Sequence, residues 1–297
     1  MMISVIMPVL NRERFVGSAI QSVISQDYDD WELIVVDGRS TDRTLKIVEQ
    51  YAAVDKRIRL YVYDEKRGDL AATNYGISRA KGDIIGILHS DDMYPPNALS
   101  HVAERFSRDS ELDVLCPRVL IIADYGDRIE IEREFQTDLR FENLVLKGPV
   151  EPARFFRRRL FESAGPIDDT YGYLGFREWW IKISLRPDVK WDITQQVCYI
   201  YRRHPQSGTS NFNKYTPLRY LPEHYRMVKK LLSLWSTNQQ VANVLKQRWL
   251  NDSIAGFMLS LRAGRFGDAL FYFVKGTEIN YSYPLKLIRK KILDWLR

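Results

Sequence analysis

The chain is 297 residues long, with 45% hydrophobic and 28% charged residues, a composition typical of a folded globular protein and not of a disordered chain. Its net charge of +6 is uneven, because residues 285–297 hold five cations and one acid, and a basic character confined to one end argues against nucleic acid as a partner. Apolar runs are far shorter than the roughly 20 residues that span a bilayer, and Met1 leads into an apolar run without the basic flank of a signal peptide.

Up to about residue 118, apolar strand-like runs alternate with helical patterns. Repeated units of this kind predict an α/β fold with a parallel sheet covered by helices on both faces. The expected strands cover residues 3–9, 33–36, 58–63, 84–88 and 114–122, and the expected helices cover 14–25, a stretch from Ser40 as N-cap to residue 51, 70–80, and a stretch that opens at Pro95.

Beyond residue 124 the alternation loosens. We expect an edge strand or hairpin at 128–135, a helix at 178–185, a strand at 197–201, and helices throughout the remainder, at 222–235, 241–262, 266–275 and 285–297. The pattern divides the chain into residues 1–118, 119–212 and 213–297. Cys116 and Cys198 lie far apart in apolar runs, which indicates reduced core residues and a cytosolic protein.

Carboxylates stand where predicted strands end: Asp37 after one strand, and Asp91 with Asp92 after another. The carboxyl ends of strands are where open α/β sheets bind ligands. Adjacent like charges repel unless a cation lies near them, so a divalent metal that carries a diphosphate is the expected occupant. The alternatives are that Asp92 caps the helix at Pro95 and that Asp37 caps the helix that follows it.

The first strand is followed by polar residues as well. Pro8 is expected to end strand pairing, and the turn after it places Asn11 and Arg12 at the same edge of the sheet.

Four segments recur together in one known family. They are Ile6-Met-Pro-Val-Leu-Asn11, Val36-Asp-Gly-Arg-Ser-Thr-Asp42, Asn74-Tyr-Gly-Ile with Ala80-Lys-Gly-Asp83, and Ser90-Asp-Asp92. In this order and spacing the set resembles glycosyltransferase family 2, whose members use nucleotide sugars and have the GT-A fold, a Rossmann-like and mainly parallel sheet. The resemblance continues more loosely to residue 205 and does not cover the C-terminal helices, which form a helical extension.

The resemblance implies a role for each matching residue. Residues 1–118 would be the nucleotide-sugar-binding half and 119–212 the acceptor-binding and catalytic half of one GT-A domain. Asp92 would be the direct ligand of Mn²⁺ or Mg²⁺, with Asp91 near the ribose or sugar and a second possible ligand, and His204 a further candidate ligand. The donor-binding residues implied are Pro8, Asn11, Asp37, Arg67, Asn74, Asp91, Arg202 and Arg203, with Asp37 contacting the nucleobase.

An inverting transfer needs a base for the acceptor hydroxyl, and Glu178 is our candidate, because it precedes a tryptophan-rich helix. Family members commonly carry an acid two residues earlier, where this chain has Phe176. The base is therefore Glu178, or Asp168 or Asp169, or else the protein is a catalytically impaired nucleotide-sugar-binding protein. Glu178 as an ion-pair partner of Arg177 or Lys182 is the structural alternative.

The segment 285–297 has the pattern of a basic amphipathic helix with a tryptophan at its edge, which suits an anionic membrane surface. The alternative is that its apolar stripe docks on the preceding helices. The sequence thus predicts an inverting, metal-dependent transferase that moves a sugar from a nucleotide-diphosphate donor, expected to be a UDP-sugar, to a glycan acceptor. The acceptor would be lipid-linked, and the enzyme would sit on the inner face of the plasma membrane in polysaccharide biosynthesis.

Overall fold

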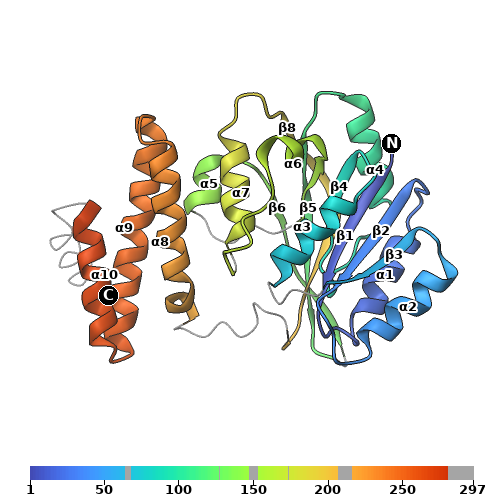
Figure 1. The fold of residues 1–297 in the computed structure, drawn as a ribbon, viewed down its shortest axis with the longest axis horizontal. Helices are drawn as coiled ribbons and strands as arrows, with labels where there is room; N and C mark the ends of the chain where they lie inside the picture. The colour runs from blue at the N-terminus through green and yellow to red at the C-terminus, as the bar shows by residue number, and fades with distance from the viewer. Residues whose placement is uncertain (64–67, 127, 147–152, 173, 207–215, 280–297) are drawn as a thin grey trace. The chain divides into compact units, whose positions relative to one another are not determined.

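The computed structural model describes residues 1–63, 68–126, 128–146, 153–172, 174–206 and 216–279 (Figure 1). The chain divides into two compact units, one formed by Met1–Leu144 with Pro149–Ser210 and the other by Val145–Gly148 with Asn211–Arg297. The first unit contains the sheet and every candidate site residue that the structure describes, whereas the second contains the C-terminal helices.

Four parallel strands form the first half of the sheet, in the order β3-β2-β1-β4. Every residue of β1 and β2 is buried, as expected of strands covered on both faces. The strands are β1 (Ile3–Val9), β2 (Trp31–Asp37), β3 (Ile58–Val62) and β4 (Ile84–Ile87). The predicted parallel arrangement of this part of the chain is therefore confirmed.

The second half of the sheet is mixed, with strands β5 (Val114–Asp124), β6 (Ile129–Gln136), β7 (Phe155–Arg157) and β8 (Trp191–Arg203). Strand β7 lies between β4 and β5 and is antiparallel to both, so β5 runs in the direction of β4. Strand β8 pairs in parallel with β5 and therefore also runs in that direction. As a result β1, β2, β4 and β8 present their carboxyl ends at one edge of the sheet.

Helices cover both faces of the sheet (Figure 1). On one face, Val5 and the other odd-numbered residues of β1 share a core with α1 (Val16–Ile24), α2 (Thr44–Val54) and α4 (Ala98–Arg108). On the other face lies α3 (Asp69–Arg79), whose Gly76 comes so close to β1 that a Cβ there would lie 2.6 Å from Cγ2 of Ile6. The helices α5 (Phe141–Leu146), α6 (Arg159–Ala164) and α7 (Gly175–Ser184) complete the first unit.

Three local expectations need correction. The helix expected after Ser40 begins at Thr44, and the helix expected from Pro95 begins at Ala98. Pro8 lies inside β1 and ends pairing on one side only: the pairing with β4 stops before it, whereas the pairing with β2 continues beyond it to Val9.

The second unit contains α8 (Thr216–Leu234), α9 (Gln239–Arg262) and α10 (Phe266–Ile279). These helices correspond to those predicted at 222–235, 241–262 and 266–275, which confirms the C-terminal helical extension. Within the described residues, no helix combines the length and the apolar character that crossing a membrane requires. The helix predicted at 285–297 lies outside the described residues.

Candidate functional site

Polar side chains gather at the carboxyl edge of the sheet, as the parallel directions of β1, β2, β4 and β8 require. They follow four strands that are far apart in the sequence, so only the sheet brings them together. These residues are Asn11 and Arg12 after β1, Asp37 and Ser40 at the end of β2, His89, Asp91 and Asp92 after β4, and Tyr199 to His204 at the end of β8.

Asp92 is fixed in a buried turn directly after β4, where it is 1% exposed. One of its carboxylate oxygens, Oδ2, accepts a hydrogen bond from the Tyr199 hydroxyl at 2.6 Å, and the other, Oδ1, accepts one from the backbone N–H of Arg202 at 2.8 Å. Burial and the charge of Asp92 raise the pKa of Tyr199 well above its ordinary value, so the hydroxyl keeps the proton that it donates. The alternative in which Asp92 caps a helix is wrong, because α4 has Asn97 as its N-cap.

Asp91 lies beside Asp92 and is surrounded by positive and proton-donating groups. Nε2 of His204 is 3.0 Å from Oδ2 of Asp91, and Nε of Arg12 is 3.6 Å from the same oxygen. Burial alone would raise the pKa of Asp91, but the His204 hydrogen bond and the charges of His89 and Arg12 outweigh it, so the pKa lies below its ordinary value. The carboxylate is therefore ionised and available as a ligand.

His204 is buried against the ring of Phe15, with ring centroids 4.0 Å apart. The backbone N–H of Gln206 donates to Nδ1 of His204 at 3.2 Å, which assigns the proton of a neutral ring to Nε2, the atom that faces Asp91. In this geometry the candidate metal ligand His204 is a donor that orients Asp91, a role typical of residues that support metal ligands.

His89 joins the two carboxylates at the end of β4. Strand β4 ends at Ile87, and Nδ1 of His89 lies 3.8 Å from Oδ2 of Asp92. The ligand atoms of His89, Asp91 and Asp92 all lie within 4.8 Å of one another. Carboxylate oxygens are the ligands that Mn²⁺ and Mg²⁺ prefer, so Asp91 and Asp92 with the imidazole beside them fit a divalent cation.

The side chains of Arg202 and Arg203, for which the resemblance implies donor binding, both contact protein groups in this structure. The guanidinium of Arg202 is buried, where it donates to Oγ of Ser18 at 3.2 Å and lies 3.8 Å from the carboxylate of Asp124. Burial lowers the pKa of Arg202. Arg203 is bound to both carboxylate oxygens of Glu132 on β6, at 2.8 and 2.7 Å. Both guanidinium groups are thus held by protein partners, and it is the backbone N–H of Arg202 that reaches the acids.

Asp37 is fully buried at the end of β2, and both of its oxygens accept from Ser40, one from the hydroxyl at 2.5 Å and one from the backbone N–H at 2.9 Å. The same hydroxyl accepts from the backbone N–H of Asn11, whose side chain accepts from Thr41. The turn after β2 is thereby tied to the turn after β1. The alternative of Asp37 as a helix cap is wrong, because α2 begins only at Thr44.

Asn74 holds the segment that precedes the candidate base. Its side-chain amide donates to the carbonyl oxygen of Ile167 at 2.7 Å and accepts from the N–H of the same residue at 3.0 Å. Helix α7 begins beside this segment at Gly175, where a Cβ would lie 2.6 Å from the carbonyl oxygen of Asp168. Only glycine permits this approach, so the start of α7 is placed by α3 and residues 165–168.

Glu178 lies in the first turn of α7 and is fully buried beside Trp179 and Trp180. Nζ of Lys182 is 3.8 Å from Oε2 of Glu178, so the ion pair considered as a structural alternative is present. The fallback candidates Asp168 and Asp169 are half-buried, and Oδ1 of Asp168 accepts from the N–H and the hydroxyl of Thr170. The donor-binding candidate Arg67 lies outside the described residues.

Two residues that contact Asp91 or Asp92 received no functional role in the sequence analysis: Tyr199 and Arg12. Tyr199 lies within a strand-like apolar run and carries no motif, so only the pairing of β8 with β5 reveals its contact with Asp92. Arg12 was placed at the right edge of the sheet, yet its proximity to Asp91 depends on the turn after β4. The position of Arg12 just after the predicted first strand was the sequence feature that could have assigned it to the site.

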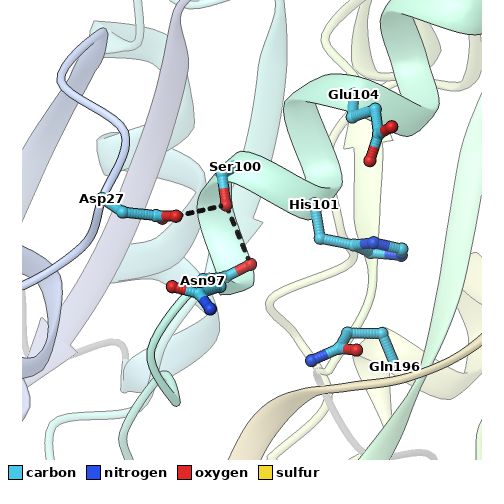
Figure 2. Close-up of a pocket in the computed structure, with 6 residues that line it drawn as sticks. All are labelled: Asp27, Asn97, Ser100, His101, Glu104 and Gln196. Atoms are coloured by element: carbon cyan, nitrogen blue, oxygen red, sulfur yellow. Dashed lines mark hydrogen bonds between the residues drawn. The ribbon is translucent and has the colours of Figure 1, made fainter.

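A separate hollow of ≈ 490 Å³ lies elsewhere in the first unit, between α4 and β8. Figure 2 shows its lining, in which the hydroxyl of Ser100 donates to Asp27 and to the carbonyl oxygen of Asn97. Nε2 of His101 lies 2.8 Å from the hydroxyl of Thr194. The lining residues of this hollow do not include His89, Asp91 or Asp92. We place the functional site at the carboxyl edge of the sheet, because those three side chains lie together there.

A family model described as Glycosyl transferase family 2 matches residues 4–165. An uncharacterized glycosyltransferase of Rickettsia typhi, RT0329, is 36% identical, with 100% of this chain and 96% of the relative covered. The O-antigen biosynthesis glycosyltransferase WbnJ of Escherichia coli is 27% identical, with 69% of this chain and 81% of the relative covered. Other relatives align over only 36% to 46% of their own length, so the matched part of this chain spans less than half of them.

Two solved structures share the architecture. S. aureus TarS 1–349 in complex with UDP-GlcNAc has a TM-score of 0.61 at 16% identity, with 96% of this chain and 92% of that chain covered. The mannosyltransferase PcManGT from Pyrobaculum calidifontis in complex with GDP-Man and Mn²⁺ has a TM-score of 0.56 at 16% identity, with 98% and 87% covered. At these identities the likeness concerns the fold.

The mainly parallel sheet, the acids at its carboxyl edge and the C-terminal helices define a protein of the GT-A fold class. The chain belongs to glycosyl transferase family 2.

Proposed function

We propose that the protein is an inverting, metal-dependent glycosyltransferase that moves a sugar from a nucleotide-diphosphate donor, expected to be a UDP-sugar, to a glycan acceptor. The observation that carries the proposal is the turn after β4, where two carboxylates and an imidazole lie within 4.8 Å of one another at the carboxyl edge of the sheet. The TarS structure with UDP-GlcNAc and the PcManGT structure with GDP-Man and Mn²⁺ support a nucleotide-sugar donor and a divalent cation.

His89, Asp91 and Asp92 would hold Mn²⁺ or Mg²⁺, which supplies positive charge for the departing nucleoside diphosphate. Tyr199, the backbone N–H of Arg202 and the ring of His204 keep the two carboxylates in place by hydrogen bonds. Such partners commonly matter for metal affinity, because they fix the orientation of the ligands.

Replacement of Tyr199 by phenylalanine is expected to weaken Mn²⁺ binding by about 10- to 100-fold, because Asp92 loses a buried hydrogen bond of 2.6 Å. Calorimetric titration of the purified variant with Mn²⁺ measures this change directly. Sugar transfer should recover at high Mn²⁺ concentration, since the ligands themselves remain.

Tyr94→Phe is the matched control for Tyr199→Phe. Tyr94 is also buried, its ring centroid lies 6.0 Å from that of Tyr199, and among the described residues its hydroxyl has no hydrogen-bond partner. This variant should bind Mn²⁺ as the wild type does. Equal Mn²⁺ affinity of Tyr199→Phe and the wild type would contradict the role given to Tyr199.

Glu178 is the proposed base that accepts the proton of the acceptor hydroxyl. Its position in the first turn of α7, a helix whose start lies against the carbonyl oxygen of Asp168, supports the assignment. Asp168 and Asp169 remain the fallback candidates, and a catalytically impaired nucleotide-sugar-binding protein remains the alternative function, motivated by Phe176 at the position where the family commonly has an acid.

The donor-binding roles implied by the resemblance also stay proposals; they concern Pro8, Asn11, Asp37, Asn74, Asp91, Arg67, Arg202 and Arg203. The contacts of the described residues among them indicate two kinds of role. Asn11 and Asp37 shape the floor of the site through Ser40, and Asn74 positions the segment that leads to α7. Residues 1–118 and 119–212 would then supply the donor and acceptor sides of one domain.

The acceptor is proposed to be a lipid-linked oligosaccharide used in polysaccharide biosynthesis, with the protein located peripherally on the inner face of the plasma membrane. The O-antigen relative supports the pathway class, and the basic composition of residues 285–297 supports attachment to anionic lipid. Nucleic acid is not a proposed partner.

A thermal-shift screen of nucleotide sugars tests the proposed donor. A UDP-sugar with Mn²⁺ should raise the melting temperature, since a ligand at 100 times its Kd stabilises the folded state by about 2.7 kcal/mol. The shift should shrink when Mn²⁺ is replaced by a chelator. If GDP-mannose stabilises the protein and no UDP-sugar does, the UDP assignment fails, and if no nucleotide sugar shifts the melting temperature with either ion, the donor class fails.

A further inference from the structure

Helix α10 exposes an apolar face that no described residue covers. Phe266, Leu270 and Val274 follow one another at intervals of four residues, and Phe271 lies next to them on the helix surface. Their exposed fractions are 72%, 64%, 47% and 46%, respectively. Large apolar side chains gathered in this way on a protein surface commonly mark a contact with another body.

The opposite face of α10 is already used for packing inside the second unit. Ala269, Tyr272 and Gly276 are buried, and Tyr272 packs so close to Gly256 of α9 that a Cβ at that glycine would lie 2.5 Å from the ring. The indole N–H of Trp249 donates to the carbonyl oxygen of Lys275 at 3.0 Å. The helix is therefore held by one face and presents the other to its surroundings.

The net positive charge of the chain lies mainly in the sequence that follows α10. Residues 262–297 hold eight cations and three acids, which is +5 of the total net charge of +6. Arg265 precedes Phe266 in the turn before α10, where its guanidinium pairs with Asp268 at 2.5 Å and keeps a side-chain exposure of 58%. Exposed apolar side chains within a strongly basic stretch are typical of helices that lie on anionic lipid surfaces.

We propose that the Phe266–Val274 face of α10 docks on an anionic lipid bilayer and lies in its interfacial region. A second copy of this chain is a poor occupant, because each copy has a net charge of +6 and two such chains repel each other. Lying on the surface, rather than spanning it, agrees with the absence of a described helix long and apolar enough to cross a membrane. The proposal rests on the membrane location given above and not on the donor chemistry.

Co-sedimentation of the full chain with vesicles tests the proposal, with pure phosphatidylcholine compared to phosphatidylcholine mixed with phosphatidylglycerol. The wild type should bind the mixed vesicles, and the binding should weaken as salt rises. The double variant Phe266→Ser, Leu270→Ser should bind at least about tenfold more weakly, because two apolar side chains no longer enter the interface.

The matched control is the double variant Ile129→Ser, Ile131→Ser on the edge strand β6, where the side chains are equally exposed, at 60% and 73%. It should bind vesicles as the wild type does. A second variant, Lys290→Glu with Lys291→Glu, separates the charge of the C-terminal segment from the apolar face and should also weaken binding to the mixed vesicles.

The proposal would be overturned if the wild type did not bind mixed vesicles, or if the Phe266→Ser, Leu270→Ser variant bound them as tightly as the wild type. It would also be overturned if light scattering showed a dimeric wild type and a monomeric variant, because the face would then belong to a contact with a second copy. Donor turnover measured without vesicles distinguishes a failure of the membrane proposal from a failure of the proposed enzyme activity. Vesicle binding without turnover would contradict the proposed enzyme alone, and turnover without vesicle binding would contradict the docking surface alone.

Discussion

Replacement of Asp92 by asparagine is expected to reduce sugar transfer by about a thousandfold and to abolish measurable Mn²⁺ binding. The carboxylate supplies the charge that a divalent cation needs, and an amide does not. An amide also has a single oxygen, so its NH₂ group would face either the Tyr199 hydroxyl or the backbone N–H of Arg202, both of which are donors. Donor turnover and Mn²⁺ titration measure the two effects.

The same substitution should cost stability, since one buried donor is left without an acceptor, at about 1–3 kcal/mol. Asp113→Asn separates this structural cost from the chemical one. Asp113 is also buried and accepts from one side chain, Nε of Arg159, and from one backbone N–H, that of Lys190. We expect a comparable loss of melting temperature for both variants and a loss of transfer for Asp92→Asn alone. Equal transfer by the two variants would contradict the metal site.

Replacement of Glu178 by glutamine is expected to slow transfer by about 10²- to 10⁴-fold, the contribution that a general base makes. Glutamine has nearly the same shape, and Glu178 is fully buried, so donor binding and the position of α7 should be preserved. Steady-state transfer and donor affinity by thermal shift are the measurements. Loss of transfer with unchanged donor affinity is the expected combination.

Three further variants decide between the roles considered for Glu178. Lys182→Met removes the ion-pair partner at 3.8 Å and should leave most of the transfer activity. If it slows transfer as much as Glu178→Gln does, the pair is structural. If Glu178→Gln is fully active and either Asp168→Asn or Asp169→Asn is inactive, the base belongs to that loop. If the wild type turns over no donor, the protein only binds nucleotide sugars.

The position of Asp91 and Asp92 in the turn after β4 could be predicted from the sequence, because the patterns that indicate it are local. A run of apolar residues predicts a buried strand, and Asp91 and Asp92 directly follow such a run, so their place at a strand end follows from the covalent chain. The parallel direction of β1 to β4 follows from the alternation of strands and helices. Together these two local patterns are sufficient to place Asp37 and the two acids at one edge of the sheet.

The residues that hydrogen-bond to Asp91 and Asp92 could not be predicted from local patterns. Tyr199, Arg202 and His204 lie more than a hundred residues from Asp91 and Asp92, and their contacts depend on the pairing of β8 with β5, which contains two irregularities of register. A shift of one residue would turn the Tyr199 side chain to the other face of the sheet. The sequence pattern of a strand contains no information about which neighbour it pairs with.

The amino-acid sequence by itself determined the α/β architecture, the C-terminal helices and the carboxyl-edge position of Asp37, Asp91 and Asp92, because apolar periodicity and chain order act over short distances. Only the tertiary structure decided that the Arg202 side chain is buried against Ser18 and Asp124, that His204 donates to Asp91, and that α10 keeps an apolar face exposed. These features arise from burial and long-range pairing, in which the free energy of a side chain depends on neighbours that the local sequence does not specify.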